Sequence, residues 1–253
     1  MIYGEPIVRA WSQGRPAYGV LARIGAPLAV EFVAGAGLDY VCMDLRHGLG
    51  GVDSLAGEIA ACWSGGAVPL VRTPDDNPWH IGKSLDLGAA GVIVSQVASA
   101  EQAAKAVAAT RYPPRGSRSY GPIRTNGATE APDLREGPMC FVMIETLQGL
   151  RDVEAIADTP ELTGIYVGVT NLALSMGLAP RGYGSNPDHA EAVQRVGAAC
   201  AEAGIVAGMQ CRGGREAADW AARGFRLITI GSDLTLLRGT VARELAAAGG
   251  CAA

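Results

Sequence analysis

The chain has 253 residues, of which 49% are hydrophobic and 18% charged, and its formal net charge is −4. This composition describes a globular protein with a large core, and the negative charge argues against nucleic acid or an anionic membrane as a partner. No apolar run is long enough to span a bilayer, and the first residues lack the basic-then-apolar pattern of a secretory signal. The expected location is the cytoplasm.

Eight short apolar runs recur along the chain, and each is predicted to be a strand: 17–23, 40–45, 68–73, 91–96, 140–145, 164–169, 206–211 and 226–231. Segments with helical character follow them in turn: 27–35, 54–63, 78–87, 100–109, 149–157, 187–203, 215–222 and 234–248. Continuously apolar strands that alternate with helices indicate a parallel sheet buried on both faces. The pattern predicts the α/β class, with one (β/α)₈ TIM barrel domain over residues 1–253.

A doubly wound open sheet is the alternative fold, but no Gly-x-Gly-x-x-Gly segment follows the first strand. Two connections, 112–138 and 169–186, are long and rich in proline and glycine, which is typical of lids or oligomer contacts. The helix over 234–248 is apolar on one face. We expect it to pack against a neighbouring subunit as well as against its own barrel.

Polar side chains gather where the predicted strands end. In such a barrel the carboxyl ends of the strands form one rim, and active sites are built there. A histidine, cations and carboxylates on one rim suit proton abstraction beside a carbonyl, with the enolate oxygen neutralised by a cation or a metal. The strand-end residues are Asp44, Arg46, His47, Arg72, Glu145, the turn Gly168 to Asn171, Ser232 and Asp233.

Each of these residues also has a structural interpretation. His47 could be a polar loop residue, and spacing alone leaves that interpretation and the catalytic one open. Arg72 could be a structural partner of Glu145 or Asp44, and Glu145 could cap the next helix. The other two histidines, His80 and His189, lie near predicted helix starts and are expected on the outer surface.

At these residues the chain resembles the HpcH/HpaI aldolases, the metal-dependent pyruvate aldolases related to 4-hydroxy-2-oxoheptanedioate aldolase. The resemblance runs in order over about residues 17–245. The segments that carry it include Asp-Leu-Arg-His-Gly at 44–48, Val-Arg-Thr-Pro at 71–74, Arg-Tyr-Pro-Pro-Arg-Gly at 111–116, Ile-Glu-Thr at 144–146 and Gly-Ser-Asp-Leu at 231–234.

The resemblance implies a (β/α)₈ barrel whose eighth helix is exchanged between subunits, in a homo-oligomer that is commonly a hexamer, a trimer of dimers. It implies a lyase that joins or splits the enolate of a pyruvate-like 2-oxo acid and an aldehyde, with some decarboxylation of oxaloacetate. His47 would be the base, acting through a water and paired with Asp86, and Arg72 would hold the enolate oxygen. The backbone at Gly168 and Thr170 would bind the substrate carboxylate.

The resemblance also implies a divalent metal, Mg²⁺ or Mn²⁺, with Glu145 as its first ligand. The family has an aspartate in a Gly-Pro-Ala-Asp-Leu segment as second ligand, where this chain has Asn171. Asparagine offers only a neutral carbonyl oxygen, so the predicted metal site is weakened. Arg46 is a second departure, because relatives carry Glu or Gln just before the histidine. Both changes make the site more positive.

Three interpretations follow. The first is a family-type lyase with an altered metal site. In the second, Arg46 and Arg72 bind an anionic substrate without metal, for a specialised condensation, cyclisation or isomerisation. The third is a catalytically silent barrel.

Overall fold

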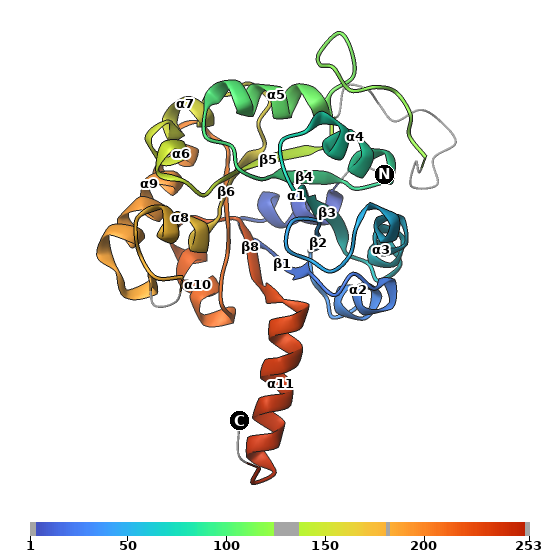
Figure 1. The fold of residues 1–253 in the computed structure, drawn as a ribbon, viewed down its shortest axis with the longest axis vertical. Helices are drawn as coiled ribbons and strands as arrows, with labels where there is room; N and C mark the ends of the chain where they lie inside the picture. Colours follow the sequence, from blue (N-terminus) through green and yellow to red (C-terminus); the bar gives the residue numbers. More distant parts are fainter. Residues whose placement is uncertain (1–3, 124–136, 181–182, 251–253) are drawn as a thin grey trace.

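A computed structural model describes residues 4–123, 137–180 and 183–250 of the chain. Within them eight parallel strands close into a barrel in chain order, with β8 paired to β1 (Figure 1). The predicted barrel is confirmed, and each strand lies within two residues of its predicted bounds. The strands are β1 (Ala17–Ala22), β2 (Tyr40–Asp44), β3 (Val68–Arg72), β4 (Gly91–Val94), β5 (Met139–Ile144), β6 (Gly164–Val167), β7 (Val206–Gln210) and β8 (Leu227–Ser232).

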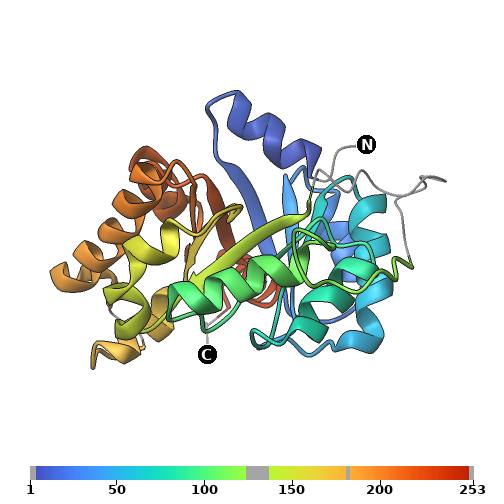
Figure 2. The ribbon, with the colours of Figure 1, turned by 90° about the horizontal axis from the view of Figure 1, so that it is seen from above.

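Helices lie on both sides of the strands (Figure 2). They are α1 (Glu5–Ser12), α2 (Pro27–Ala34), α3 (Val52–Ser64), α4 (Pro78–Asp86), α5 (Ala100–Thr110), α6 (Leu147–Arg151), α7 (Val153–Ala157), α8 (Val169–Ser175), the 3₁₀ turn η1 (Tyr183–Ser185), α9 (Pro187–Glu202), α10 (Gly214–Ala222) and α11 (Asp233–Ala247).

Three helical details differ from the prediction. The segment predicted as one helix over 149–157 is two helices, because Asp152 ends α6 and begins α7. The connection after β6 contains α8, and α1 precedes the barrel. Neither helix was predicted from the sequence. Residues 124–136 and 181–182, which belong to the two predicted long connections, lie outside the described residues.

The protein has two apolar cores, one inside the barrel and one between the strands and the helices. Tyr40, Phe141 and Tyr166 are the largest side chains of the interior core, and each is at most 1% exposed. The α1 side chains Ile7 and Ala10 belong to the same cluster, so α1 packs against the barrel interior. Tyr40 and Tyr166 both hydrogen-bond the hydroxyl of Thr229 inside the barrel, at 2.8 and 2.7 Å.

The helix α11 extends away from the barrel (Figure 1). Its first residue, Asp233, is buried and accepts hydrogen bonds from the backbone of Arg23 and Ile24. Further along, Leu237 and Val241 are 60% and 58% exposed. The helix contacts β1 and β8 of its own barrel, and its packing against a neighbouring subunit stays a prediction. Among the described helices, none combines the length and apolar character needed to cross a membrane.

Candidate active site

A cavity of about 230 Å³ opens among the carboxyl ends of the strands. It is lined by Arg23, His47, Arg72, Met143, Glu145, Tyr166, Val167, Gly168, Val169, Thr170, Asn171 and Gln210. The structure thus brings together most of the residues that the sequence analysis placed on the rim. Arg46 and Asp86 do not line this cavity.

Asp44 and Arg72 form a buried, two-pronged ion pair. Strands β2 and β3 align Asp44 with Arg72, so both side chains point to the same side of the sheet. Arg72 donates from Nε to Asp44 Oδ1 at 2.8 Å and from Nη2 to Oδ2 at 2.5 Å. Burial alone would raise the pKa of the Asp44 carboxyl, but the bonds and charge of Arg72 outweigh burial and lower it. Asp44 is therefore an anion that fixes the orientation of Arg72.

Arg72 keeps one donor group for another partner. Its Nη1 forms no hydrogen bond within the described part of the chain, and the side chain lines the cavity. A guanidinium held rigidly on one edge presents its other edge as a preorganised donor to an oxyanion.

His47 lies beside this pair. Its backbone N–H donates to Asp44 Oδ1 at 3.1 Å, and its ring lines the cavity. Partial burial lowers the pKa of the imidazole, the positive charges of Arg72, Arg46 and Arg23 lower it further, and Asp44 opposes them. The imidazole is therefore neutral at neutral pH, as a proton acceptor must be.

Arg23, at the end of β1, is a cavity residue that the sequence analysis missed. It donates from Nη2 to the backbone oxygen of His47 at 2.7 Å, and its Nε lies 3.4 Å from Asp44 Oδ2. The rule that strand ends carry the site could have found it, since it directly follows the first strand. Gln210, at the end of β7, could have been found in the same way.

Glu145, just after β5, is 3% exposed and surrounded by donors. The backbone N–H of Gln96 donates to Oε1 at 3.0 Å, and the side-chain amide of Asn171 donates to Oε2. Gln96 has a left-handed backbone with φ of 63°, which is uncommon for a residue other than glycine. Gly168 lies against Glu145, where an added Cβ would stand 2.7 Å from the Glu145 Cβ.

Arg46 lies beside Glu145 and outside the cavity lining. Its Nη1 donates to the backbone oxygen of Pro74 at 2.8 Å, and its Nη2 is 3.7 Å from Glu145 Oε1. The Arg46 Nε is buried and has no hydrogen-bond partner among the described residues. Although it adjoins His47 in sequence, Arg46 is thus directed toward the carboxylate on β5.

The turn from Gly168 into α8 supplies backbone to the cavity. Gly168, Val169 and Thr170 line it, and the first turn of a helix has N–H groups without partners inside the helix. The imidazole of His189 donates from Nε2 to the Val169 oxygen at 2.9 Å. The expected surface position of His189 is therefore wrong: it is 4% exposed and braces this turn. His80 is partly exposed and pairs with Asp75, as a surface histidine can.

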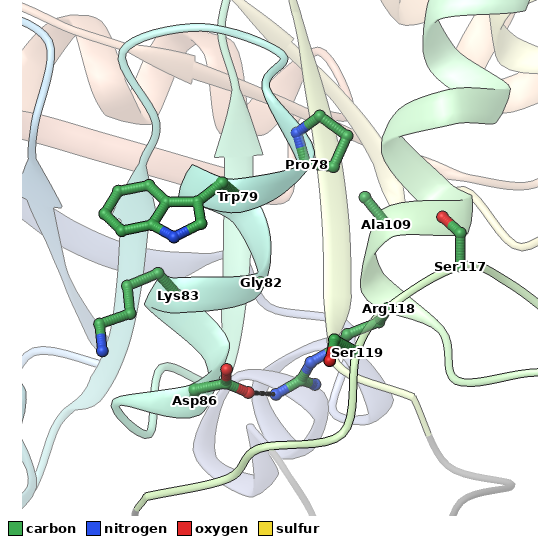
Figure 3. Close-up of a pocket in the computed structure, with 9 residues that line it drawn as sticks. All are labelled: Pro78, Trp79, Gly82, Lys83, Asp86, Ala109, Ser117, Arg118 and Ser119. Carbon is green, nitrogen blue, oxygen red and sulfur yellow. Dashed lines mark hydrogen bonds and ion pairs between the residues drawn. The ribbon is translucent and has the colours of Figure 1, made fainter.

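Asp86 lies in a different part of the molecule from His47. It is the last residue of α4, which starts near the rim and runs back outside the barrel for about 13 Å. There Asp86 pairs with Arg118 at 2.7 Å in a pocket that also includes Trp79 and Lys83 (Figure 3). Within the described part of one chain, no hydrogen bond joins Asp86 to His47. The implied pair is not formed inside a single subunit.

The donor set near Glu145 does not fit a divalent ion well. Hard cations prefer several oxygen ligands, including carboxylates. Here Glu145 is the single carboxylate beside a neutral amide, the amide nitrogen faces it, and a guanidinium lies 3.7 Å away. Across the described residues, no group of three or more His, Cys, Asp or Glu side chains is placed to hold a metal ion.

The HpcH/HpaI aldolase/citrate lyase family model matches residues 21–239. A hydroxypyruvate/pyruvate aldolase from Rhizorhabdus wittichii is 32% identical over 239 residues, which cover 93% of this chain and 95% of the relative. A 4-hydroxy-2-oxo-heptane-1,7-dioate aldolase from Salmonella typhimurium is 32% identical over 237 residues, covering 90% of this chain and 88% of the relative.

Two solved structures show the same fold. A crystal structure of an HpcH/HpaI aldolase/citrate lyase family protein from Burkholderia cenocepacia aligns with a TM-score of 0.88 and 28% identity, over 98% of this chain and 100% of that one. The structure of the citrate synthase SbnG aligns with a TM-score of 0.81 and 28% identity, over 95% of this chain and 94% of that one.

Proposed function

Because the chain belongs to the HpcH/HpaI aldolase/citrate lyase family and is a carbon–carbon lyase, we propose that its cavity forms and stabilises the enolate of a pyruvate-like 2-oxo acid. The enolate then adds to an aldehyde, or is released when the corresponding aldol is split. The observation that carries this proposal is that His47 and Arg72 line one small cavity, with the Arg72 Nη1 making no hydrogen bond within the described residues.

His47 is the proposed base, acting directly or through a water. It accepts a proton from C3 of the 2-oxo acid, and the C–H electron pair moves so that negative charge develops on the C2 oxygen. Arg72 donates to that oxygen, and its geometry is fixed in advance by Asp44. In the cleavage direction the same groups act in reverse, with the proton moving from the aldol hydroxyl.

The substrate carboxylate is proposed to bind the backbone at Gly168 to Thr170. The Gly168 N–H donates to the Ile144 oxygen at 2.9 Å, so the anion would be held by the N–H groups that follow it at the start of α8. His189, through the Val169 oxygen, supports this turn, and Gly168 allows it to lie close to Glu145.

Aldolases of this family generally depend on a divalent metal ion. When bound, such an ion polarises the carbonyl that becomes the enolate. Glu145 and Asn171 are the residues that would hold Mg²⁺ or Mn²⁺ in this chain. With one anionic ligand instead of two, we propose that either ion binds weakly at most.

Asp86 remains a proposed partner of His47, but only between copies of the chain. Its place at the far end of α4 puts it out of reach of the His47 in the same barrel. A homo-oligomer, for which the sequence analysis expects a hexamer, could bring the α4 end of one subunit to the rim of another. The hexamer, the exchange of α11 and the cytoplasmic location all stay predictions.

A second candidate function is a specialised condensation of an anionic substrate without metal. The similarity to the citrate synthase SbnG favours it, because a citrate synthase is a condensing enzyme. The cavity lining has two cations, Arg23 and Arg72, against one carboxylate, Glu145, which would suit a substrate with more than one carboxylate.

Deuterium exchange into the methyl group of pyruvate, followed by ¹H NMR, tests the enolate proposal. We expect the wild-type protein to exchange the methyl protons, and His47→Ala to slow exchange by about 10²–10⁴-fold, the usual range for a general base. Circular dichroism of the variant should match the wild type, since the ring is on the rim and not in the core. Absence of exchange in the wild type, or an unchanged rate in His47→Ala, would refute the proposed role.

A further inference from the structure

The carboxylate of Glu145 is already committed to groups of the protein. Oε1 accepts from the Gln96 backbone at 3.0 Å and lies 3.7 Å from the Arg46 guanidinium, and Oε2 accepts from the Asn171 amide. A divalent ion on Glu145 would have to displace the amide hydrogen bond. It would also have to lie near a fixed positive charge.

Arg46 is held where it is by more than Glu145. Its Nη1 donates to the Pro74 oxygen at 2.8 Å, and its side chain is only 15% exposed. Because the Nε is buried without a partner among the described residues, the guanidinium gives up a hydrogen bond in this position. The Arg46 guanidinium thus lies next to the buried Glu145 carboxylate even though its Nε lacks a hydrogen bond within the described part of the chain. In this position its positive charge offsets the negative charge of Glu145.

Glu145, Asn171 and Arg46 offer one carboxylate, one neutral amide and one guanidinium. The single negative charge of this group is therefore matched by a single positive charge of the protein. A divalent ion bound here would add two positive charges with no second carboxylate among these side chains to offset them.

We infer that the charge of Glu145 is balanced without a divalent ion. Arg46 is a positioning residue that supplies the positive charge beside Glu145. The inference rests on the proposed enolate chemistry and extends it. The C–H bond at C3 of the 2-oxo acid breaks, its proton goes to His47, and the negative charge on the C2 oxygen is stabilised by Arg72. Arg46 does not contact the substrate. It holds Glu145, and through it Asn171, in place.

Metal binding and exchange are measured separately on the same protein. The wild type is freed of metal with EDTA and titrated with Mn²⁺, with free Mn²⁺ followed by electron paramagnetic resonance. Pyruvate methyl exchange is recorded in EDTA and again in Mn²⁺. The same measurements are made on Arg46→Gln, Asn171→Asp and the double variant. Arg195→Gln, which removes an exposed arginine paired with Glu154 on the outer helices, is the matched control.

We expect wild-type exchange to be the same in EDTA and in Mn²⁺ within about twofold, and Mn²⁺ to bind the double variant at least about tenfold more tightly, since ligand charge sets affinity. Exchange by the double variant should become dependent on Mn²⁺. Arg46→Gln alone should lower kcat more than it raises KM, because Glu145 is displaced but the carboxylate site remains. Arg195→Gln should behave as wild type.

Two results would overturn the inference while leaving the proposed function intact. One is wild-type exchange that is lost in EDTA and restored by Mn²⁺. The other is tight, stoichiometric Mn²⁺ binding that the double substitution does not improve. If the wild type shows no exchange under any condition, the enolate proposal fails instead, and the Mn²⁺ titrations still decide whether Arg46 and Asn171 set the affinity for metal.

Discussion

The two halves of the barrel rim hold their carboxylates in different ways. Asp44, at the end of β2, is gripped by two hydrogen bonds from Arg72 and lies 3.4 Å from Arg23. Glu145, after β5, receives one backbone N–H and one neutral amide, and its nearest cation is 3.7 Å away. Both carboxylates are 3% exposed.

Asp44 and Glu145 are therefore two buried carboxylates with different surroundings. Asp44 orients the guanidinium of Arg72, which lines the cavity together with His47. Glu145 has donors on both oxygens, and the cation beside it stays out of the cavity lining. The first half holds the proposed base and the proposed oxyanion donor. The second half holds the proposed metal ligands, Glu145 and Asn171, beside Arg46.

Breaking the Asp44–Arg72 pair should have the largest effect. Arg72→Ala leaves the buried Asp44 carboxylate with two backbone N–H donors and with Arg23 as its neighbouring cation. We expect a loss of about 3–5 kcal/mol in the free energy of unfolding. Exchange should fall by about 10²–10³-fold, as when a preorganised oxyanion donor is removed. Urea unfolding and the NMR exchange assay measure the two effects.

Two further variants separate folding from chemistry at this pair. Arg72→Lys keeps the charge but not the two-pronged geometry, so it should fold better than Arg72→Ala and still exchange slowly. Arg195→Ala removes an exposed pair and should cost at most about 1 kcal/mol. If Arg72→Ala were no less stable than Arg195→Ala, the assigned role of the buried pair would be wrong.

The sequence could predict much of this because strand periodicity and strand ends are local features. Eight apolar runs predicted the barrel. The rule that sites lie at strand ends predicted that His47, Arg72 and Glu145 would lie together. The direction of a side chain that leaves a strand is not local. Arg46 and His47 are neighbours in sequence, yet Arg46 turns to Pro74 and Glu145.

Contacts between distant segments were also beyond the sequence. His189 looks like a surface residue at a helix start, but its ring meets the Val169 oxygen, twenty residues away. Asp86 falls in a segment that matches the family, and only the path of α4 shows that it ends far from the His47 of the same chain.

Crowding Glu145 tests the other half of the rim. In Gly168→Ala the new Cβ would stand 2.7 Å from the Glu145 Cβ and 3.3 Å from its Oε2, so the carboxylate or the turn must move. The Gly168 backbone itself is not left-handed, so the expected cost comes from this contact. We expect exchange to fall by about 10²-fold, as for a small misplacement of a reacting group.

Gly82→Ala is the matched control for this substitution. No heavy atom lies within 4 Å of a Cβ added there, and alanine favours the helix by about 0.5–1 kcal/mol. Its exchange rate should be that of the wild type. Equal rates for Gly168→Ala and Gly82→Ala would mean that the position of Glu145 does not matter to enolate formation.

Substitution of Asp86 should have a smaller effect, and it tests whether the His47 half of the rim needs a residue from a second chain. We expect Asp86→Asn to slow exchange by about tenfold, less than the 10²–10⁴-fold expected for the base itself, because a partner that orients the base leaves the base in place. If Asp86 serves the His47 of another copy, co-expressed Asp86→Asn and His47→Ala subunits should form some intact sites and exceed the activity of either variant alone. Additive activity in the mixture would rule out a shared site.

The pH dependence of exchange should respond to Arg46, because its charge, beside Glu145, also lowers the pKa of His47. His47 can accept a proton only when neutral, so exchange should fall as the pH drops through its pKa. Burial and the charges of Arg72, Arg46 and Arg23 place that pKa below the ordinary value of about 6.5. Arg46→Gln removes one of these charges and should move the acidic limb of kcat/KM upward, toward the ordinary value, while Arg195→Gln should not move it. Added salt screens charges near the surface and should shift the wild-type limb in the same upward direction. A wild-type limb above pH 6.5, or one that Arg46→Gln moves downward, would show that the arginines do not set the protonation of His47.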